Sequence, residues 1–264
     1  MNYIVANPIG NITVLVTSGV PQSERLAVVQ ELFEKEPTCE QVGFVQVLGE
    51  NQIALEMMGG EFCGNATMST AAYLAKTNAL ACGTKTTIMV DASGADEPVE
   101  VEIVRRGENY FIGKLEMPMP RMDTYACVDN DGTATQFPLV HLDGISHMIV
   151  PAGETSREEM ERSIKKIADE LGVPALGIIR CSELEDEQSL CDDTSIDVAI
   201  EPLVYVKGSG TLVWENGCAS GSIATAYYRY VKNGVTESAI KNPGGVMNVK
   251  FEDGRLFITG TVEL

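Results

Sequence analysis

The stretch EFCGNATMSTAAYLA, residues 61–75, returns in altered form as ENGCASGSIATAYYRY, residues 215–230. Each block follows an extended apolar stretch, QIALEMM or GTLVWE, and then enters a run of small and apolar residues. Aligned on their cysteines without gaps, the blocks match at Thr67 and Ser222, Met68 and Ile223, Thr70 and Thr225, Ala71 and Ala226, and Tyr73 and Tyr228. A helix that lacks a polar face is a buried helix. The repeat therefore predicts two buried helices, one beginning at Cys63 and the other at Cys218.

The sequence around the two blocks also repeats. An amphipathic helical pattern precedes each block, at 23–35 and at 156–171, and the second pattern opens like a capping box. Alternating segments typical of strands follow each block; they are residues 84–90, 98–106 and 109–117 after the first, and 247–253 and 255–263 after the second. We therefore expect an α+β fold of two pseudo-symmetric halves, each a mainly antiparallel sheet wrapped around a central buried helix.

Two prolines interrupt the strand pattern in the stretch MPMPRMDT, residues 117–124. This interruption divides the chain into an N-terminal half, residues 1–118, which carries Cys63, and a C-terminal half, residues 119–264, which carries Cys218. The alternative is that the last strands of the second half pack back on the first half, which would make the domain boundary discontinuous. The site is expected in the cleft between the halves.

Composition narrows the range of functions. With 264 residues, 44% of them hydrophobic, the chain can bury a sizeable core. Nineteen Lys and Arg against 38 Asp and Glu give a net charge of −19, which argues against nucleic acid and anionic membranes as partners. No apolar run approaches the roughly 18–20 residues of a membrane span, and the N-terminus lacks the features of a signal peptide. The sequence therefore predicts a cytoplasmic protein.

The seven cysteines are widely spaced and form no C-x-x-C motif. This spacing, without a secretion signal, argues against a disulfide framework. With only His141 and His147 as further ligands, a zinc site is not expected either, and we predict no metal. A functional cysteine in this chain therefore acts as a thiol. The cysteines that open no repeated helix are interpreted as incidental; they are Cys39, Cys82, Cys127, Cys181 and Cys191.

A cysteine at a helix start lies beside unpaired backbone N–H groups and the positive end of the helix dipole. That environment lowers the pKa of a thiol from about 8.5 toward neutrality. The residues that follow the cysteines, Gly64 and Asn65 or Ala219 and Ser220, are small enough to let an anion approach the backbone. One such cysteine is ordinary, but two in equivalent places indicate two thiols on either side of a bound carboxylate. Such a pair can exchange a proton at the adjacent carbon without a cofactor.

The motifs FCGNAT and WENGCASGS, in matching halves, resemble the diaminopimelate epimerase family of cofactor-independent amino-acid racemases and epimerases. The resemblance spans essentially the whole chain and implies that fold, a small amino-acid substrate and a homodimer. It implies that Cys63 and Cys218 are the catalytic bases and that Glu215 meets the substrate α-ammonium. The remaining substrate-binding residues that it implies are Asn11, Gly64, Asn65, Ala219 and Ser220, the last four through their backbone N–H groups.

Three departures from this family concern the residues that would bind the distal carboxylate of diaminopimelate. Ile145 and Asn216 stand where the family carries asparagine and arginine, and the asparagine upstream of the first cysteine has no clear counterpart in ALEMMGGEF. Each loss removes a charged hydrogen bond worth roughly 1.5–3 kcal/mol, so selection for diaminopimelate is not expected. The wording GGEFCGNAT looks closer to the branch that contains histidine racemases. The best single choice of substrate is therefore histidine, with its imidazole or ammonium near one of the carboxylates of Glu40, Glu56 and Glu61.

Other functions remain open. One alternative is an epimerase of diaminopimelate or of a proline-like amino acid, since related families share the paired cysteines. A PhzF-like isomerase is disfavoured, because that family replaces the first thiol. The non-enzymatic alternatives are a catalytically silent amino-acid-binding protein and a thiol-rich metal handler. His147 is interpreted as a strand residue in a hydrogen-bonded position, with contact to substrate as the alternative.

Overall fold

The computed structural model describes residues 1–128, 134–153, 155–183 and 198–264. Cys191 lies outside these residues. The chain divides into two compact units, one of Met1–Met117 with Phe257–Leu264 and the other of Pro118–Leu256. The C-terminal residues thus belong to the same unit as the N-terminus. Within the described residues, no helix is long and apolar enough to cross a membrane.

The first unit is a sheet of eight strands in the order β1-β2-β3-β4-β5-β6-β7-β16, counted over the described residues. Its parallel pairs, β2–β3 and β4–β5, are each joined by a helix, whereas β1–β2, β3–β4, β5–β6 and β6–β7 are antiparallel. The elements are β1 (Tyr3–Ala6), β2 (Thr13–Val16), a 3-10 turn (Gln22–Glu24), α1 (Arg25–Lys35), β3 (Gln41–Gly49), β4 (Gln52–Met57), α2 (Gly64–Thr77), β5 (Lys85–Ala92), β6 (Val99–Arg105), β7 (Tyr110–Met117) and β16 (Arg255–Glu263).

The second unit repeats this order of strand pairings. The pair β9–β10 is antiparallel, β10–β11 is parallel across α3, β11–β12 is antiparallel, β12–β14 is parallel across α4, and β14–β15 is antiparallel. Strand β13 adds to β12 outside this series. The elements are β8 (Arg121–Val128), β9 (Ala134–Leu142), β10 (Ile145–Pro151), α3 (Arg157–Leu171), β11 (Ala175–Glu183), β12 (Val198–Val206), β13 (Thr211–Trp214), α4 (Ala219–Asn233), β14 (Glu237–Asn242) and β15 (Gly245–Glu252). The α+β class with mainly antiparallel strands and few helices is confirmed.

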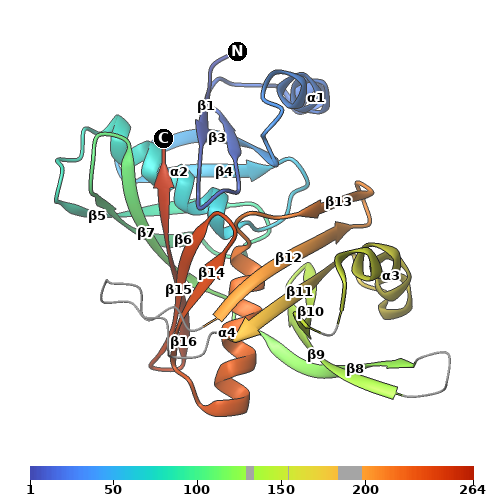
Figure 1. The fold of residues 1–264 in the computed structure, drawn as a ribbon. Helices are drawn as coiled ribbons and strands as arrows, with labels where there is room; N and C mark the ends of the chain where they lie inside the picture. The colour runs from blue at the N-terminus through green and yellow to red at the C-terminus, as the bar shows by residue number, and fades with distance from the viewer. Residues whose placement is uncertain (129–133, 154, 184–197) are drawn as a thin grey trace. The chain divides into compact units, whose positions relative to one another are not determined.

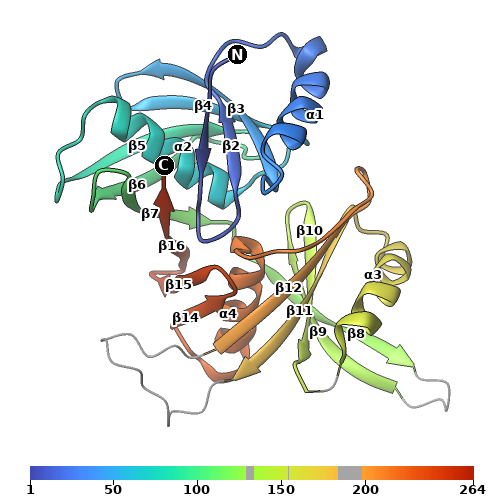
Figure 2. The ribbon, with the colours of Figure 1, turned by 45° about the horizontal axis from the view of Figure 1, so that its top comes forward.

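Helix α2 forms the core of the first unit. It packs against β4, β5, β6 and β7, and Figure 2 shows it among the strands of its own unit. Met68, which is fully buried on this helix, lies against strand positions without a side chain. A Cβ atom at Gly113 would come within 3.0 Å of Met68, and one at Gly260 within 3.3 Å. These two glycines therefore let the strands pack closely on the helix.

The amphipathic helices cover the sheets from outside. Helix α3 lies beside β11 and β12 (Figure 1) and buries Met160, Ile164 and Ile167. The predicted capping box is confirmed, because the Ser156 side chain accepts from the Glu159 N–H and the Glu159 side chain accepts from the Ser156 N–H. The sequence pattern therefore predicts both the start and the buried face of this helix correctly.

Helix α4 differs from the expectation of burial on nearly all sides. Its first two turns are buried, but Tyr230 is 40% exposed and Val231 is 50% exposed. The Tyr230 ring stacks on that of Phe251 in β15, with 4.3 Å between the centroids. Tyrosine and arginine side chains bury their stems and keep their polar tips in water, so the block YYRY gives a half-exposed helix end. The prediction is correct for the turns next to Cys218 and wrong for the last ones.

Candidate functional site

Both cysteines are N-cap residues with extended backbone, Cys63 before α2 and Cys218 before α4. The carbonyl oxygen of Cys63 accepts from the Thr67 N–H, and that of Cys218 accepts from the Ser222 N–H, each at 2.9 Å. The N–H groups between the cap and these first helical bonds belong to the first turn of the helix and precede its regular bonding pattern. They include those of Gly64 and Asn65 in one unit and of Ala219 and Ser220 in the other. Each helix start is thus able to bind a carboxylate group.

The Cys63 thiol belongs to a hydrogen-bonded network in the first unit. Its Sγ donates to Gln41 Oε1 at 3.3 Å. The Gln41 Nε2 group in turn donates to Asn11 Oδ1 and to Thr13 Oγ1, each at 2.7 Å. Gln41 begins β3 and reaches the thiol across 22 residues of sequence. No local sequence pattern marks Gln41 as a site residue, because only the fold brings it to the thiol.

The network continues through Asn11, which is 5% exposed. Asn11 Oδ1 also accepts from Asn65 Nδ2 at 3.1 Å, and Asn11 Nδ2 donates to Glu40 Oε2 at 2.5 Å. The structure thus brings together four residues of this unit that the sequence singled out, Asn11, Glu40, Cys63 and Asn65. Among the three carboxylates considered for the substrate side chain, Glu40 is the one hydrogen-bonded into this network.

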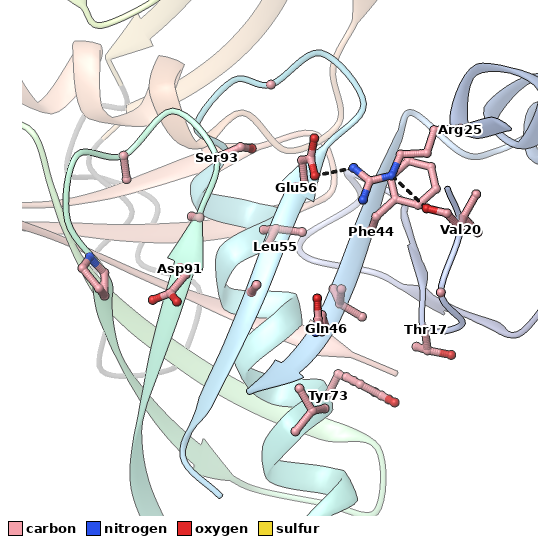
Figure 3. A pocket seen from close by; sticks show the side chains of 18 of the residues that line it. Thr17, Val20, Arg25, Phe44, Gln46, Leu55, Glu56, Tyr73, Asp91 and Ser93 are labelled. Atoms are coloured by element: carbon pink, nitrogen blue, oxygen red, sulfur yellow. Dashed lines mark hydrogen bonds and ion pairs between the residues drawn. The ribbon is translucent and has the colours of Figure 1, made fainter. Parts of the chain in front are cut away.

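A pocket of the first unit lies elsewhere on the sheet (Figure 3) and has a volume of about 1030 Å³. The Arg25 guanidinium lies over the Phe44 ring, 4.6 Å from its centroid, and pairs with Glu56 at the edge of this pocket. Tyr73 and Asp91 line it as well, but neither predicted catalytic cysteine does. Glu56 therefore forms an ion pair with Arg25 in this pocket and, among the described residues, is not part of the hydrogen-bonded network around Cys63.

The Cys218 thiol lies in the second unit, where it is 2% exposed. Its Sγ accepts from the Gly221 N–H at 3.3 Å and lies 3.5 Å from Ser220 Oγ, and the thiol also hydrogen-bonds to the Glu215 side chain. The Cys218 N–H donates to Asn242 Oδ1 at 2.9 Å. Asn242 is a contact of Cys218 that no sequence pattern marks, because the segment that follows it is typical only of a turn.

Burial raises the pKa of the Cys218 thiol well above its usual value, and the charge of Glu215 and its hydrogen bond raise it further. Hydrogen bonds from Ser220 and Gly221 lower it by less. The prediction that the helix start brings this thiol toward neutrality is therefore wrong for Cys218 in this structure. The loss of hydration outweighs the helix dipole, and the neighbouring Glu215 carboxylate adds to the increase in the pKa.

His147, on β10, is fully buried in the second unit, and its Nε2 lies 2.9 Å from Ser220 Oγ. Burial lowers its pKa to about 3, so the ring is neutral at physiological pH. Its Nδ1 has no hydrogen-bond partner among the described residues. The ring lies over Gly177 of β11, its register partner, where a Cβ atom would be 2.1 Å from Nδ1. His147 is thus a buried strand residue that supports Ser220.

Gly177→Ala is expected to lower the free energy of unfolding by about 1–3 kcal/mol, because the new methyl group displaces a fully buried ring. Urea unfolding followed by circular dichroism measures this change. Gly208→Ala in the same unit is the matched control, since nothing lies within 4 Å of its Cβ position, and it should change the value by less than about 0.5 kcal/mol. Equal stability of the two variants would show that the His147 ring is not held against β11.

The described residues contain no group of three or more His, Cys, Asp or Glu side chains placed to hold a metal ion. The chemistry available at the two helix starts is that of thiols, carboxylates and backbone N–H groups. Residues 1–262 match the family described as "Histidine racemase CntK N-terminal domain". The chain belongs to the histidine racemase family.

Two relatives support this assignment across most of the chain. A histidine racemase of Fusobacterium nucleatum is 30% identical over 270 residues, covering 100% of this chain and 94% of the relative. A histidine racemase of Staphylococcus aureus is 26% identical over 248 residues, covering 90% and 84%. As a member of the histidine racemase family, this chain is an isomerase of the racemase and epimerase class.

A solved structure agrees with the fold. The crystal structure of a probable proline racemase from Agrobacterium radiobacter, with bound carbonate, has a TM-score of 0.67 to this chain and covers 98% of it and 89% of its own length. The two sequences are 12% identical, so the likeness concerns the fold alone. This chain thus shares a fold with a protein that is named for another substrate.

Proposed function

We propose that this chain is a histidine racemase that works without pyridoxal phosphate and uses Cys63 and Cys218 as its acid and base at the α-carbon. The observation that carries the proposal is the equivalent position of the two thiols. Each is the N-cap of the helix that joins the second parallel strand pair of its unit. Membership of the histidine racemase family supports the reaction class.

In the proposed reaction one sulfur begins as thiolate and the other as thiol. The thiolate removes the α-proton from one face of the substrate, and the electron pair of the broken C–H bond delocalises into the carboxylate. The thiol then delivers its proton to the opposite face, and the two sulfurs exchange protonation states. The N–H groups of Gly64, Asn65, Ala219 and Ser220 hold the carboxylate and stabilise the charge that develops on it. The proposal requires the diaminopimelate epimerase-like arrangement, in which both thiols reach one α-carbon.

Glu215 has two roles in this proposal. Its side chain hydrogen-bonds to the Cys218 thiol, which supports Glu215 as the group that takes the thiol proton when Cys218 becomes a thiolate. Ser220 and Gly221 then donate to the bare sulfur. The same carboxylate is proposed to meet the α-ammonium of the substrate, which fixes the amino acid beside the reacting sulfur.

The choice of histidine rests on the groups available for the side chain. Glu40 supplies a half-buried carboxylate within the Cys63 network, suited to an imidazole N–H. Ile145 and Asn216 offer no cation for a distal carboxylate, which disfavours diaminopimelate. A cytoplasmic homodimer is part of the same proposal. The relatives from Fusobacterium nucleatum and Staphylococcus aureus, named histidine racemases, support the substrate.

The test is racemisation without added cofactor. Purified protein, treated with hydroxylamine to remove any pyridoxal phosphate, is incubated separately with L-histidine, meso-diaminopimelate and L-proline. We expect the optical rotation of L-histidine to decay to zero, with no change in the other two amino acids. Conversion of proline or diaminopimelate with histidine untouched would overturn the substrate. Binding of an amino acid without α-proton exchange would favour the silent binding protein.

A further inference from the structure

The direction of the hydrogen bond at Cys63 is fixed by residues that lie beyond it. An ionised carboxylate only accepts hydrogen bonds, so the side of the Asn11 amide that faces Glu40 Oε2 is its NH₂ group. Asn11 Oδ1 therefore faces the other way, where it accepts from Gln41 Nε2 and from Asn65 Nδ2. Two donors converge on this oxygen, which agrees with the orientation that Glu40 imposes.

Gln41 is locked in the same way. Its NH₂ group donates to Asn11 Oδ1 and to Thr13 Oγ1, while the Thr13 hydroxyl donates its own proton to the Asn11 carbonyl at 3.0 Å. A flipped Gln41 amide would set its oxygen against the Asn11 oxygen, with two acceptors and no proton between them. Asn11 and Thr13 are 5% and 0% exposed, so water does not readily replace these contacts. Gln41 Oε1 consequently points to Cys63 Sγ.

We propose that Gln41 is a positioning residue that holds Cys63 as the protonated thiol, and hence as the acid of the resting thiol pair. The role of Cys63 as an acid rests on the proposed racemase function. The hydrogen bond that keeps Cys63 protonated does not depend on that function. A fixed amide oxygen accepts from S–H and repels S⁻, so it favours the protonated sulfur. Cys218 differs in having a proton acceptor beside it, the Glu215 carboxylate, together with the Gly221 N–H, which donates to its sulfur, and Ser220, which lies beside it.

This difference determines which sulfur acts as the base and which as the acid in the resting enzyme. Cys218 removes the first α-proton after passing its own proton to Glu215, and Cys63 delivers the proton held toward Gln41. The number of protons is conserved: Glu215 keeps the proton that it took from Cys218, Cys218 holds the α-proton of the substrate, and Cys63 ends as thiolate after giving its proton to the product. The enantiomer whose α-proton faces Cys218 is then the one converted by the resting form. The opposite enantiomer presents its α-proton to Cys63, so Cys63 must first lose its own proton while Cys218 holds one.

The test measures the protonation of Cys63 directly. Native protein is alkylated with iodoacetamide between pH 6 and pH 10, and the Cys63 peptide is quantified by mass spectrometry. Gln41→Ala admits water, which donates as well as accepts, so the labelling midpoint is expected to fall by roughly half to one pH unit. Gln41→Asn, which keeps the amide but is too short to span both contacts, should give the same shift if the alanine variant does not fold.

Gln46→Ala, on the same strand but exposed, is the matched control and should leave the midpoint unchanged. A purely structural role for Gln41 would change the melting temperature without moving the midpoint. A folded Gln41 variant with the wild-type midpoint, or a higher one, overturns the proposal. Labelling needs no turnover, so a shifted midpoint in a protein that racemises nothing refutes the proposed function alone. An unshifted midpoint in an active racemase refutes only the role of Gln41.

Discussion

Cys63→Ser and Cys218→Ser are each expected to lower the rate of histidine racemisation by about 10³-fold or more. A positioned acid or base contributes roughly 10²–10⁴-fold, and a serine hydroxyl is far too weak an acid to exchange a proton with the α-carbon near neutral pH. Both cysteines cap a helix start, and serine is a good N-cap residue, so the helices should persist. The rate is measured from the decay of the circular dichroism of L-histidine.

Cys82→Ser is the control for this pair, because Cys82 is an exposed thiol that opens no helix. It should retain activity within about twofold, as surface substitutions generally do. Far-ultraviolet spectra of all three variants must match the wild type for the comparison to count. If Cys63→Ser or Cys218→Ser racemises histidine at the wild-type rate, the sulfur of that residue is neither the acid nor the base.

Glu215→Gln is expected to reduce the racemisation rate by about 100-fold, at the lower end of the contribution of an acid or base. The amide cannot take the Cys218 proton, so the buried sulfur loses its route to thiolate. This variant is expected to lower the pKa of the Cys218 thiol as well as the rate. Because Glu215 raises the pKa of the thiol, removing its charge lowers that pKa. The pH–rate profile of the variant should therefore move toward lower pH while its maximum falls.

Glu161→Gln serves as the control for this variant. Glu161 lies in the same unit and accepts from Trp214 Nε1 at 2.7 Å, away from the thiol contacts described here. Its activity and pH–rate profile should match those of the wild type. A Glu215→Gln enzyme with an unchanged profile would show that the carboxylate does not share the thiol proton.

The sequence predicts the helix starts well, because short-range patterns encode them. The small residues after Cys63 and Cys218 and the Ser156 to Glu159 box act within one turn of helix. The strands around the second helix of each repeat follow from two-residue alternation for the same reason. These local signals were sufficient to place both cysteines at N-cap positions.

The surroundings of the cysteines depend on contacts between distant segments. Gln41 meets Cys63 across 22 residues, and His147 meets Ser220 across 73. Asn242 reaches the Cys218 N–H across 24 residues. No local pattern marks these residues, since a single glutamine or asparagine beside a strand is ordinary. The raised pKa of Cys218 has the same origin, because burial is decided by the packing of the whole unit.

The isotope pattern early in the reaction tests the central claim most directly, namely that two sulfurs act on opposite faces of one α-carbon. L-Histidine is incubated with the enzyme in deuterated water, and the reaction is stopped before about a tenth of the histidine is converted. The two enantiomers are then separated, and their deuterium content is measured by mass spectrometry. Two bases predict that newly formed D-histidine carries one α-deuterium while the remaining L-histidine keeps its α-proton. Equal deuterium in both enantiomers at that stage would mean that a single base serves both faces, and the account would be wrong.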